Sequence, residues 1–212
     1  MSTEPTTPGP STPEHWDTAY AAGDTTRGWY QPQATMSMHL IEATGAPLSA
    51  SIVDVGAGAS VLVDDLLGAG YADITCVDHS PVGLRVAQDR LGDRGASVTW
   101  IIADLLTWSP PRAYDVWHDR AVLHFLLDDG AVAAYRRALL AGTHAGSWLV
   151  LGVFGPQGPQ MCAGLPVRRY DDASVEALLG SEFTLVEQVV TDHVRPDGDT
   201  QQYLWTLARR EA

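Results

Sequence analysis

The chain has few cationic side chains. Lys and Arg together number 13 against 26 Asp and Glu, so the 212 residues carry a formal net charge of -13. Binding to DNA or RNA relies on clustered cations that neutralise phosphates, and anionic membrane surfaces attract polybasic segments. The charge balance therefore argues against a nucleic-acid or membrane partner, while it is compatible with a basic protein substrate.

Cysteines, long apolar runs and metal-binding patterns are also scarce. Cys76 and Cys162 are too few for a disulfide framework or a cysteine zinc site. The histidines near the candidate site lack a short ligand spacing such as His-x-x-x-His, so we expect no metal. Because the sequence contains no run of 18 apolar residues and no charged and apolar leader, we expect a soluble, cytoplasmic protein.

The N-terminal part divides into a tail and two short helices. Residues 1–13 are rich in Thr, Pro and Ser and lack apolar periodicity, which predicts a disordered tail. Residues 14–45 are expected to form a helical cap or lid, and residues 46–212 the core. The chain is long enough, and with 45% hydrophobic residues apolar enough, for 14–212 to form a single domain.

From residue 51 onward, short β-branched strands alternate with amphipathic helices. The strands are apolar along their length, as in parallel sheets that are covered on both faces. Two strands around a Pro-Asp-Gly turn near the C-terminus predict an antiparallel hairpin. The pattern predicts an α/β fold: a doubly wound, Rossmann-like, seven-stranded sheet, its last strand antiparallel, with helices on both faces. Expected strands cover 51–55, 73–77, 98–102, 114–118, 147–154, 183–194 and 201–209; expected helices cover 60–69, 81–91, 129–141 and 172–179.

A glycine turn follows the first predicted strand, and an acidic residue ends the second strand twenty positions later. Gly56 and Gly58 lack side chains, so a ligand can approach the backbone there. Asp78 is placed where a carboxylate can accept hydrogen bonds from both hydroxyls of a ribose. The pattern predicts a nucleoside site at the carboxyl ends of parallel strands.

Two features favour a nucleoside without phosphates. The third glycine of the dinucleotide fingerprint is not at its expected place. Asp54, just before the turn, would repel a diphosphate but could receive an ammonium group. The ligand suggested is S-adenosylmethionine; the alternatives are a nicotinamide cofactor, or a Gly-x-Gly that only tightens a strand-to-helix connection.

With these elements in place, the chain resembles the class I S-adenosylmethionine-dependent methyltransferases from about residue 14 onward. The family's glycine motif corresponds to Asp54-Val55-Gly56-Ala57-Gly58, with Ser60 where many members have a third glycine. Its ribose-binding acid corresponds to Asp78, which His79 follows. The resemblance implies that Asp104 accepts from the adenine amino group and that Leu105 covers the ring.

Two subgroups share finer features with the chain. Asp119-Arg120-Ala121-Val122-Leu123 and the loop 164–170 are similar to the thiopurine and tellurite methyltransferase group. The arrangement Trp16…Trp29-Tyr30 is shared with small protein-lysine methyltransferases. The resemblance implies methyl transfer to a small molecule at sulfur, selenium, tellurium or an amine, with protein-lysine N-methylation as the alternative. A nucleoside-binding protein without turnover is a third hypothesis.

Several side chains are candidates for the chemistry. Asp119 would face the methionine end of the donor, or alternatively cap the following helix. Arg120 would pair with the donor carboxylate or an anionic acceptor, or lie in a surface ion pair. His118 and His124 are candidate acid/base groups, because histidine titrates near neutrality; the alternative is a core or surface histidine.

Aromatic side chains form a second set of candidates. Trp16, Trp29 and Tyr30 offer ring faces to a sulfonium, whose positive charge is attracted to ring quadrupoles. The alternative is that these rings pack the apolar side of a helical cap. Cys162, in the loop 155–166, is expected near the acceptor entrance, without a catalytic role.

Overall fold

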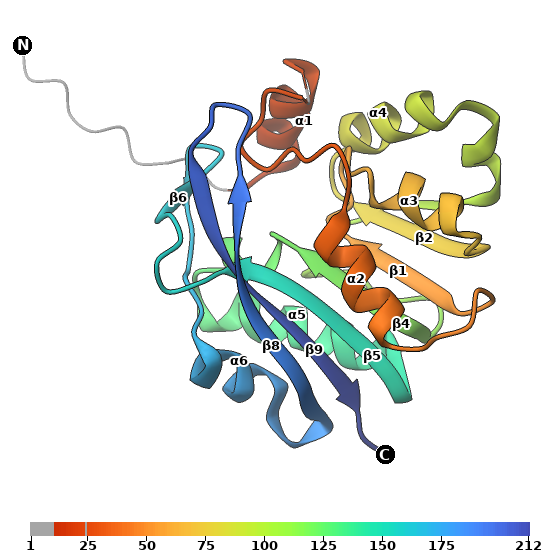
Figure 1. The fold of residues 1–212 in the computed structure, drawn as a ribbon, viewed down its shortest axis with the longest axis vertical. Coiled ribbons are helices and arrows are strands. Elements are labelled where there is room, and N and C mark those ends of the chain that lie inside the picture. The colour runs from red at the N-terminus through yellow and green to blue at the C-terminus, as the bar shows by residue number, and fades with distance from the viewer. Residues whose placement is uncertain (1–10, 24) are drawn as a thin grey trace, which may run out of the picture.

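A seven-stranded sheet forms the centre of the computed structural model, which describes residues 11–23 and 25–212 (Figure 1). The strand order is β3-β2-β1-β4-β5-β9-β8. β9 pairs antiparallel with β5 and with β8, while the other pairs are parallel. The predicted fold class is therefore confirmed. The strands are β1 Ser51–Val55, β2 Asp73–Asp78, β3 Thr99–Ile102, β4 Tyr114–Arg120, β5 Thr143–Phe154, β8 Phe183–Val194 and β9 Thr200–Arg210.

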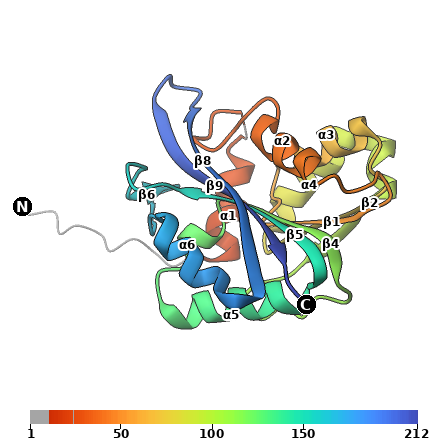
Figure 2. The same ribbon diagram turned by 60° about the horizontal axis from the view of Figure 1, so that its bottom comes forward.

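Helices cover both faces of the sheet (Figure 2). Successive side chains of a strand point to opposite faces, so Ile52 packs with one layer of helices and Val53 with the other. Because both layers bury apolar side chains, the inner strand β1 is buried along its whole length. The first layer is α2 Thr35–Ala43, α3 Leu62–Ala69 and α4 Pro81–Leu91; the second is α5 Asp129–Ala141 and α6 Asp172–Leu179.

Most predicted boundaries hold within a residue or two, and capping residues fix the starts of three helices. The side chains of Ser80, Asp128 and Asp171 accept backbone N–H groups at the starts of α4, α5 and α6. The helix predicted over 60–69 begins later, at Leu62, because the Ser60 N–H instead closes a turn onto the Ala57 carbonyl (2.8 Å). β5 begins four residues before its predicted start at 147.

The two N-terminal helices have different places in the fold. α1 (Pro13–Ala21) packs against α4 at the carboxyl ends of the strands. α2 instead lies in the core, where Leu40 and Ile41 are fully buried. Of the segment predicted as a cap, α1 therefore lies over the strand ends, and α2 covers the sheet. Residues 1–10 of the predicted tail lie outside the described residues.

The segment between β5 and α6 contains a small hairpin that the sequence did not predict. Its strands are β6 (Met161–Cys162) and β7 (Leu165–Pro166), which pair antiparallel. Ala163 and Gly164 at its tip both have positive φ (+53° and +77°), which reverses the chain over two residues. No helix in the part of the chain that the structure describes is long and apolar enough to cross a membrane.

Candidate active site

A cavity of about 660 Å³ lies at the carboxyl ends of β1, β2, β3 and β4. In open α/β sheets, ligands bind at this edge, where the strand order reverses between β1 and β4. Residues from α1 and from the β6–β7 hairpin complete the walls. Among the predicted site residues, those that line the cavity are Trp16, Trp29, Tyr30, Asp54, Gly56, Ala57, Ser60, Asp78, His79, Asp104, Leu105, His118 and Arg120.

Asp78 is held by the backbone of two loops. The Gly58 N–H donates to Oδ2 (2.9 Å), and the Ser80 N–H donates to Oδ1 (2.7 Å). Each oxygen keeps a further lone pair for a ligand hydroxyl. Asp78 therefore links the glycine turn to the start of α4 and presents a fixed acceptor at the cavity wall.

The glycine turn has a packing role that was not predicted. A Cβ on Gly56 (φ +66°) would lie 1.9 Å from Cγ2 of Val122, and one on Gly58 (φ +47°) would lie 2.0 Å from the Tyr20 hydroxyl. Protein side chains therefore occupy the space beside both glycines. Gly56 lines the cavity directly, whereas Gly58 lies beneath Tyr20 and is not among the lining residues.

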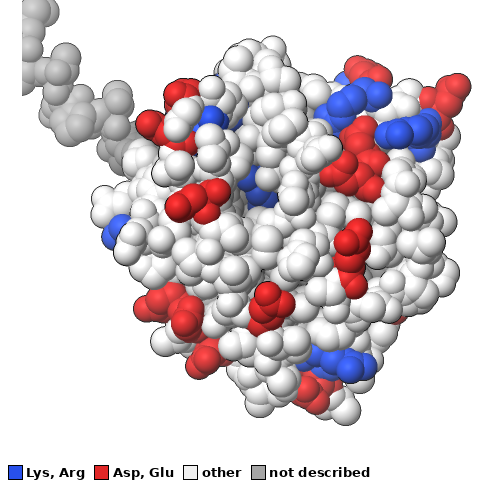
Figure 3. Space-filling view, viewed as in Figure 1, with Lys and Arg blue, Asp and Glu red and all other residues white. Residues whose placement is uncertain are grey.

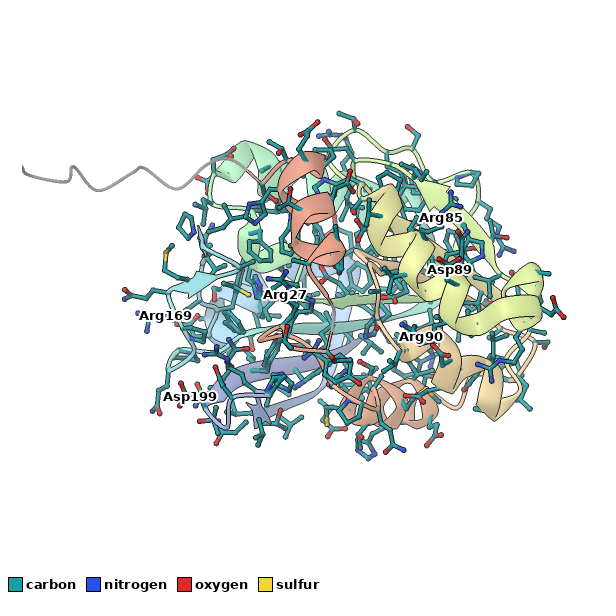
Figure 4. The ribbon with its side chains drawn as sticks, turned by 90° about the horizontal axis from the view of Figure 1, so that it is seen from above. Arg27, Arg85, Asp89, Arg90, Arg169 and Asp199 are labelled. Carbon is teal, nitrogen blue, oxygen red and sulfur yellow. The ribbon has the colours of Figure 1, made fainter. Side chains whose placement is uncertain are left out.

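The connections around the turn are fixed by two charged residues. Arg90 of α4 donates to the carbonyls of Ala59 (2.8 Å) and Ser60 (2.6 Å) (Figure 4). Asp17 of α1 accepts from the Ser80 hydroxyl (2.5 Å). Since the Ser80 backbone also donates to Asp78, α1 is connected to the Asp78 carboxylate through one residue.

Asp54 belongs to a buried polar chain that the sequence did not indicate. Its Oδ1 is 2.7 Å from Nδ1 of His118, and Nε2 of that imidazole is 2.9 Å from the Ser37 hydroxyl. All three side chains are buried, and Oδ2 of Asp54 has no protein partner. One oxygen of Asp54 is therefore left without a partner in the protein, whereas both ring nitrogens of His118 are already engaged.

Aromatic rings form the wall opposite the sheet. Trp16 packs edge-on against Trp29 (5.6 Å between ring centroids) and Phe125 (5.1 Å), and Tyr20 packs edge-on against Trp29 (6.3 Å). These four rings line the cavity as a cluster. Both interpretations of the aromatics are thus compatible with the packing, because the rings cap the fold and also present faces to the cavity.

Asp119 and His124 lie behind the cavity wall. Asp119 accepts from the backbone N–H groups of Val122 (2.9 Å) and Leu123 (3.2 Å), as expected for the capping alternative. His124 is fully buried, stacks on Phe154 (4.3 Å between centroids) and is not among the cavity-lining residues. Burial and the nearby charge of Arg120 lower the pKa of His124 to about 3, which keeps it neutral.

The ionisation of Asp78 predicts a pH dependence of donor binding. Burial raises its pKa to about 6, although hydrogen bonds from Ser80 and Gly58 act in the opposite direction. The ionised carboxylate is the stronger acceptor for ribose hydroxyls, so affinity for S-adenosylhomocysteine should be full at pH 7.5 and fall as the pH passes below 6. Titration calorimetry between pH 5 and 8 measures this.

The matched variant is Asp78→Asn, which cannot ionise and should bind weakly with no change across that range. An Asp78→Asn protein with the same pH profile as wild type would show that another group, such as Asp119, is responsible. The pKa of Asp119 is also raised by burial to about 6.

Comparison with known proteins points to one class of domain. Residues 52–142 match the family described as a methyltransferase domain. The chain is 31% identical over 100 residues to mouse (Mus musculus) EEF1A lysine methyltransferase 2, a match that covers 41% of this chain and 39% of that relative. The chain thus spans about two fifths of the length of this curated relative.

Solved structures share the fold over almost the whole chain. One of them was solved in work on the conversion of a disulfide bond into a thioacetal group during echinomycin biosynthesis. Its TM-score is 0.74 at 20% sequence identity, and the match covers 94% of this chain and 93% of the other chain. Another is Burkholderia thailandensis 1,6-didemethyltoxoflavin-N1-methyltransferase with bound S-adenosylhomocysteine. Its TM-score is 0.70 at 21% sequence identity, and the match covers 100% of this chain and 94% of the other chain. These likenesses concern the fold.

The residues present fit S-adenosylmethionine. The cavity has a carboxylate for a ribose (Asp78), an unpartnered buried oxygen for an ammonium group (Asp54) and aromatic faces for a sulfonium. None of the cations lies in the glycine turn, where a diphosphate would need one. S-adenosylmethionine is therefore the methyl donor that the fold, the family match and the cavity jointly support.

Proposed function

We propose that the chain is a class I S-adenosylmethionine-dependent methyltransferase and that it methylates a small-molecule acceptor. The acceptor atom is a soft heteroatom (sulfur, selenium or tellurium) or an amine. The observation that carries the proposal is the cavity of about 660 Å³, whose lining is mainly apolar and aromatic. Such a lining suits a small apolar or aromatic acceptor better than the charged side chain of a protein lysine.

In this reaction the protein mainly aligns the acceptor atom with the methyl group and the donor sulfur, and it excludes water. When bound, S-adenosylmethionine supplies a methyl group that its sulfonium has already activated. A lone pair of the acceptor forms the new bond to the methyl carbon, while the electron pair of the old carbon–sulfur bond returns to the donor sulfur. The products are the methylated acceptor and neutral S-adenosylhomocysteine. Any proton on the acceptor must leave before or during this step.

The cavity-lining histidines bear on which acceptor suits the site. Within the described residues these are His79, beside Asp78 at the ribose end, and His118, whose ring nitrogens are both engaged. An ammonium acceptor would need a base to remove its proton, whereas a thiol or selenol ionises readily in water. This supports a soft acceptor over a lysine side chain.

Lysine methylation remains the second candidate, because of the 31% identity to a lysine methyltransferase over 100 residues. Asp104 and Asp128 at the cavity lining are acidic groups that a basic peptide could contact. On the face in Figure 3, however, acidic side chains form separate patches, and no continuous acidic tract leads across it.

A screen of acceptors tests the proposal. S-adenosylhomocysteine formation is followed with thiols, selenols, amines, carboxylates and basic peptides, and turnover of small thiols or selenols is expected. The 13 cationic residues of this chain are all arginine, so methyl-lysine recovered after the reaction can come only from the added peptide. Turnover with lysine peptides alone would replace the proposal by the second candidate.

Removing residues 1–31 should weaken donor binding while leaving the sheet folded. This deletion removes α1 with Trp16 and Tyr20, and also Trp29, but leaves α2 and its core contacts intact. We expect affinity for S-adenosylhomocysteine to fall at least about tenfold, because the aromatic wall contributes cation–π and apolar contacts. Calorimetry measures the affinity and circular dichroism the fold.

The control is removal of residues 1–10, which leaves every one of these contacts in place. Equal affinity in the 1–31 deletion and in wild type would contradict the assignment of α1 and its connection as a lid.

A further inference from the structure

Arg120 ends β4 with a guanidinium that is only partly paired. Its Nη1 donates to the Trp29 carbonyl (3.0 Å), and its Cζ lies 5.0 Å from the centroid of the Tyr203 ring. Its Nε and Nη2 atoms are buried and have no hydrogen-bond partner in the protein. Buried donors without partners are costly, and for a charged group the cost is larger.

No carboxylate neutralises this charge. None of the ion pairs formed by the described residues includes Arg120. It is also the one cationic side chain among the described residues that line the cavity. A partly buried, unpaired arginine at a cavity wall is a binding element for an anion, because two of its N–H groups can donate to a carboxylate side by side.

The surroundings place this charge away from the ribose carboxylate. Its electrostatic effect reaches Cys162, Tyr203, His193 and His124, which lie at the β6–β7 and β8–β9 side. The main groups that act on Asp78 are instead Ser80, His79, Gly58 and Asp54. Cys162 lines the same end, and burial raises its pKa to about 11, so it is present as a neutral thiol and does not neutralise the arginine.

From these observations we infer that Arg120 binds an anionic group of the acceptor, and that the acceptor is a small soft nucleophile carrying a carboxylate or similar anion. The inference rests on the proposed function and narrows its substrate class. A cationic lysine side chain placed beside Arg120 would be repelled by its charge, because no ion pair of the described residues includes Arg120. The rival role for Arg120 is pairing with the carboxylate of the donor, and the two roles predict different results.

The experiment uses a pair of probes that differ by one carboxylate, thiosalicylate and thiophenol. Each is titrated by calorimetry into the protein saturated with S-adenosylhomocysteine, in the presence of a reductant. Wild type is compared with Arg120→Gln, Arg120→Lys and a control, Arg169→Gln. Arg169 is exposed and lies at the periphery near β7 (Figure 4). Its replacement by Gln removes one positive charge from the chain, as Arg120→Gln does.

We expect wild type and Arg169→Gln to bind thiosalicylate at least about tenfold more tightly than thiophenol, which is the scale of one charge-assisted contact. In Arg120→Gln this preference should disappear, and in Arg120→Lys it should be partly retained. Affinity for S-adenosylhomocysteine should stay within about threefold of wild type in all variants. The ratio of the two probes is unaffected by any displacement of Trp29, because both probes experience it equally.

Three results would overturn the inference. One is a wild type with no preference for the carboxylate probe. Another is a preference that survives Arg120→Gln. The third is a loss of S-adenosylhomocysteine affinity in that variant with the probe ratio unchanged, which would assign Arg120 to the donor carboxylate. If wild type binds thiosalicylate through Arg120 but methylates no thiol, the anion site stands and the proposed soft-atom chemistry fails.

Discussion

Replacing Asp78 with alanine is expected to lower affinity for S-adenosylhomocysteine at least about tenfold, because hydrogen bonds to a carboxylate are charge-assisted. The variant loses a second contribution as well. The N–H groups of Gly58 and Ser80 that donate to Asp78 would be left buried without an acceptor. Such orphaned donors cost about 1–3 kcal/mol each, so the free energy of unfolding should also fall. Calorimetry and urea denaturation measure the two effects separately.

Asp73→Ala is the matched control for this variant. Asp73 begins the same strand, β2, and forms an exposed ion pair with Arg112. Exposed pairs contribute about 0–1 kcal/mol, so donor affinity should be unchanged and stability only slightly lower. Wild-type affinity in Asp78→Ala would mean that the ribose lies elsewhere.

Gly58→Ala should lower the donor affinity about as much as Asp78→Ala, but for a different reason. The φ of Gly58 is +47°, a region that costs an L-residue about 1–2 kcal/mol. The new Cβ would also lie 2.0 Å from the Tyr20 hydroxyl, so Tyr20 and α1 must move away from the turn. We expect Gly58→Ala to lose at least about tenfold in donor affinity, since binding would require a displaced lid.

Gly68→Ala is the control, and it is expected to raise the stability of the protein. Gly68 is exposed in α3, and a Cβ there would meet nothing within 4 Å. Alanine in a helix interior should raise stability by about 0.5–1 kcal/mol and leave donor binding unchanged. If Gly58→Ala behaved like Gly68→Ala, Tyr20 would not rest on the turn as described.

Local pattern was enough to predict the sheet and most of its helices. The strands β1 and β2 are short segments rich in β-branched residues, and Ser80-Pro81, Asp128 and Asp171 are strong helix starts. Each of these signals operates within a few residues, which is the range that a single sequence reveals reliably. The hairpin of β6 and β7 was not predicted, because strands of two residues are too short to show a periodic pattern.

Site contacts between distant residues could not be predicted in the same way. Ser37 and His118 are 81 residues apart, and no local pattern pairs them. The prediction of His124 as an acid/base group required its ring to reach the cavity. Ala121 instead adopts φ +69°, and a short 3-10 helix (Leu123–Phe125) directs His124 onto Phe154, away from the cavity. No glycine marks that reversal in the sequence.

The account depends most on a phosphate-free adenosyl ligand at the glycine turn and Asp78. Its most direct test is a calorimetric titration of the full chain at pH 7.5 with S-adenosylhomocysteine, and in parallel with NAD. We predict saturable binding of one S-adenosylhomocysteine per chain and no measurable binding of NAD. Absence of heat with S-adenosylhomocysteine together with tight binding of NAD would contradict the account.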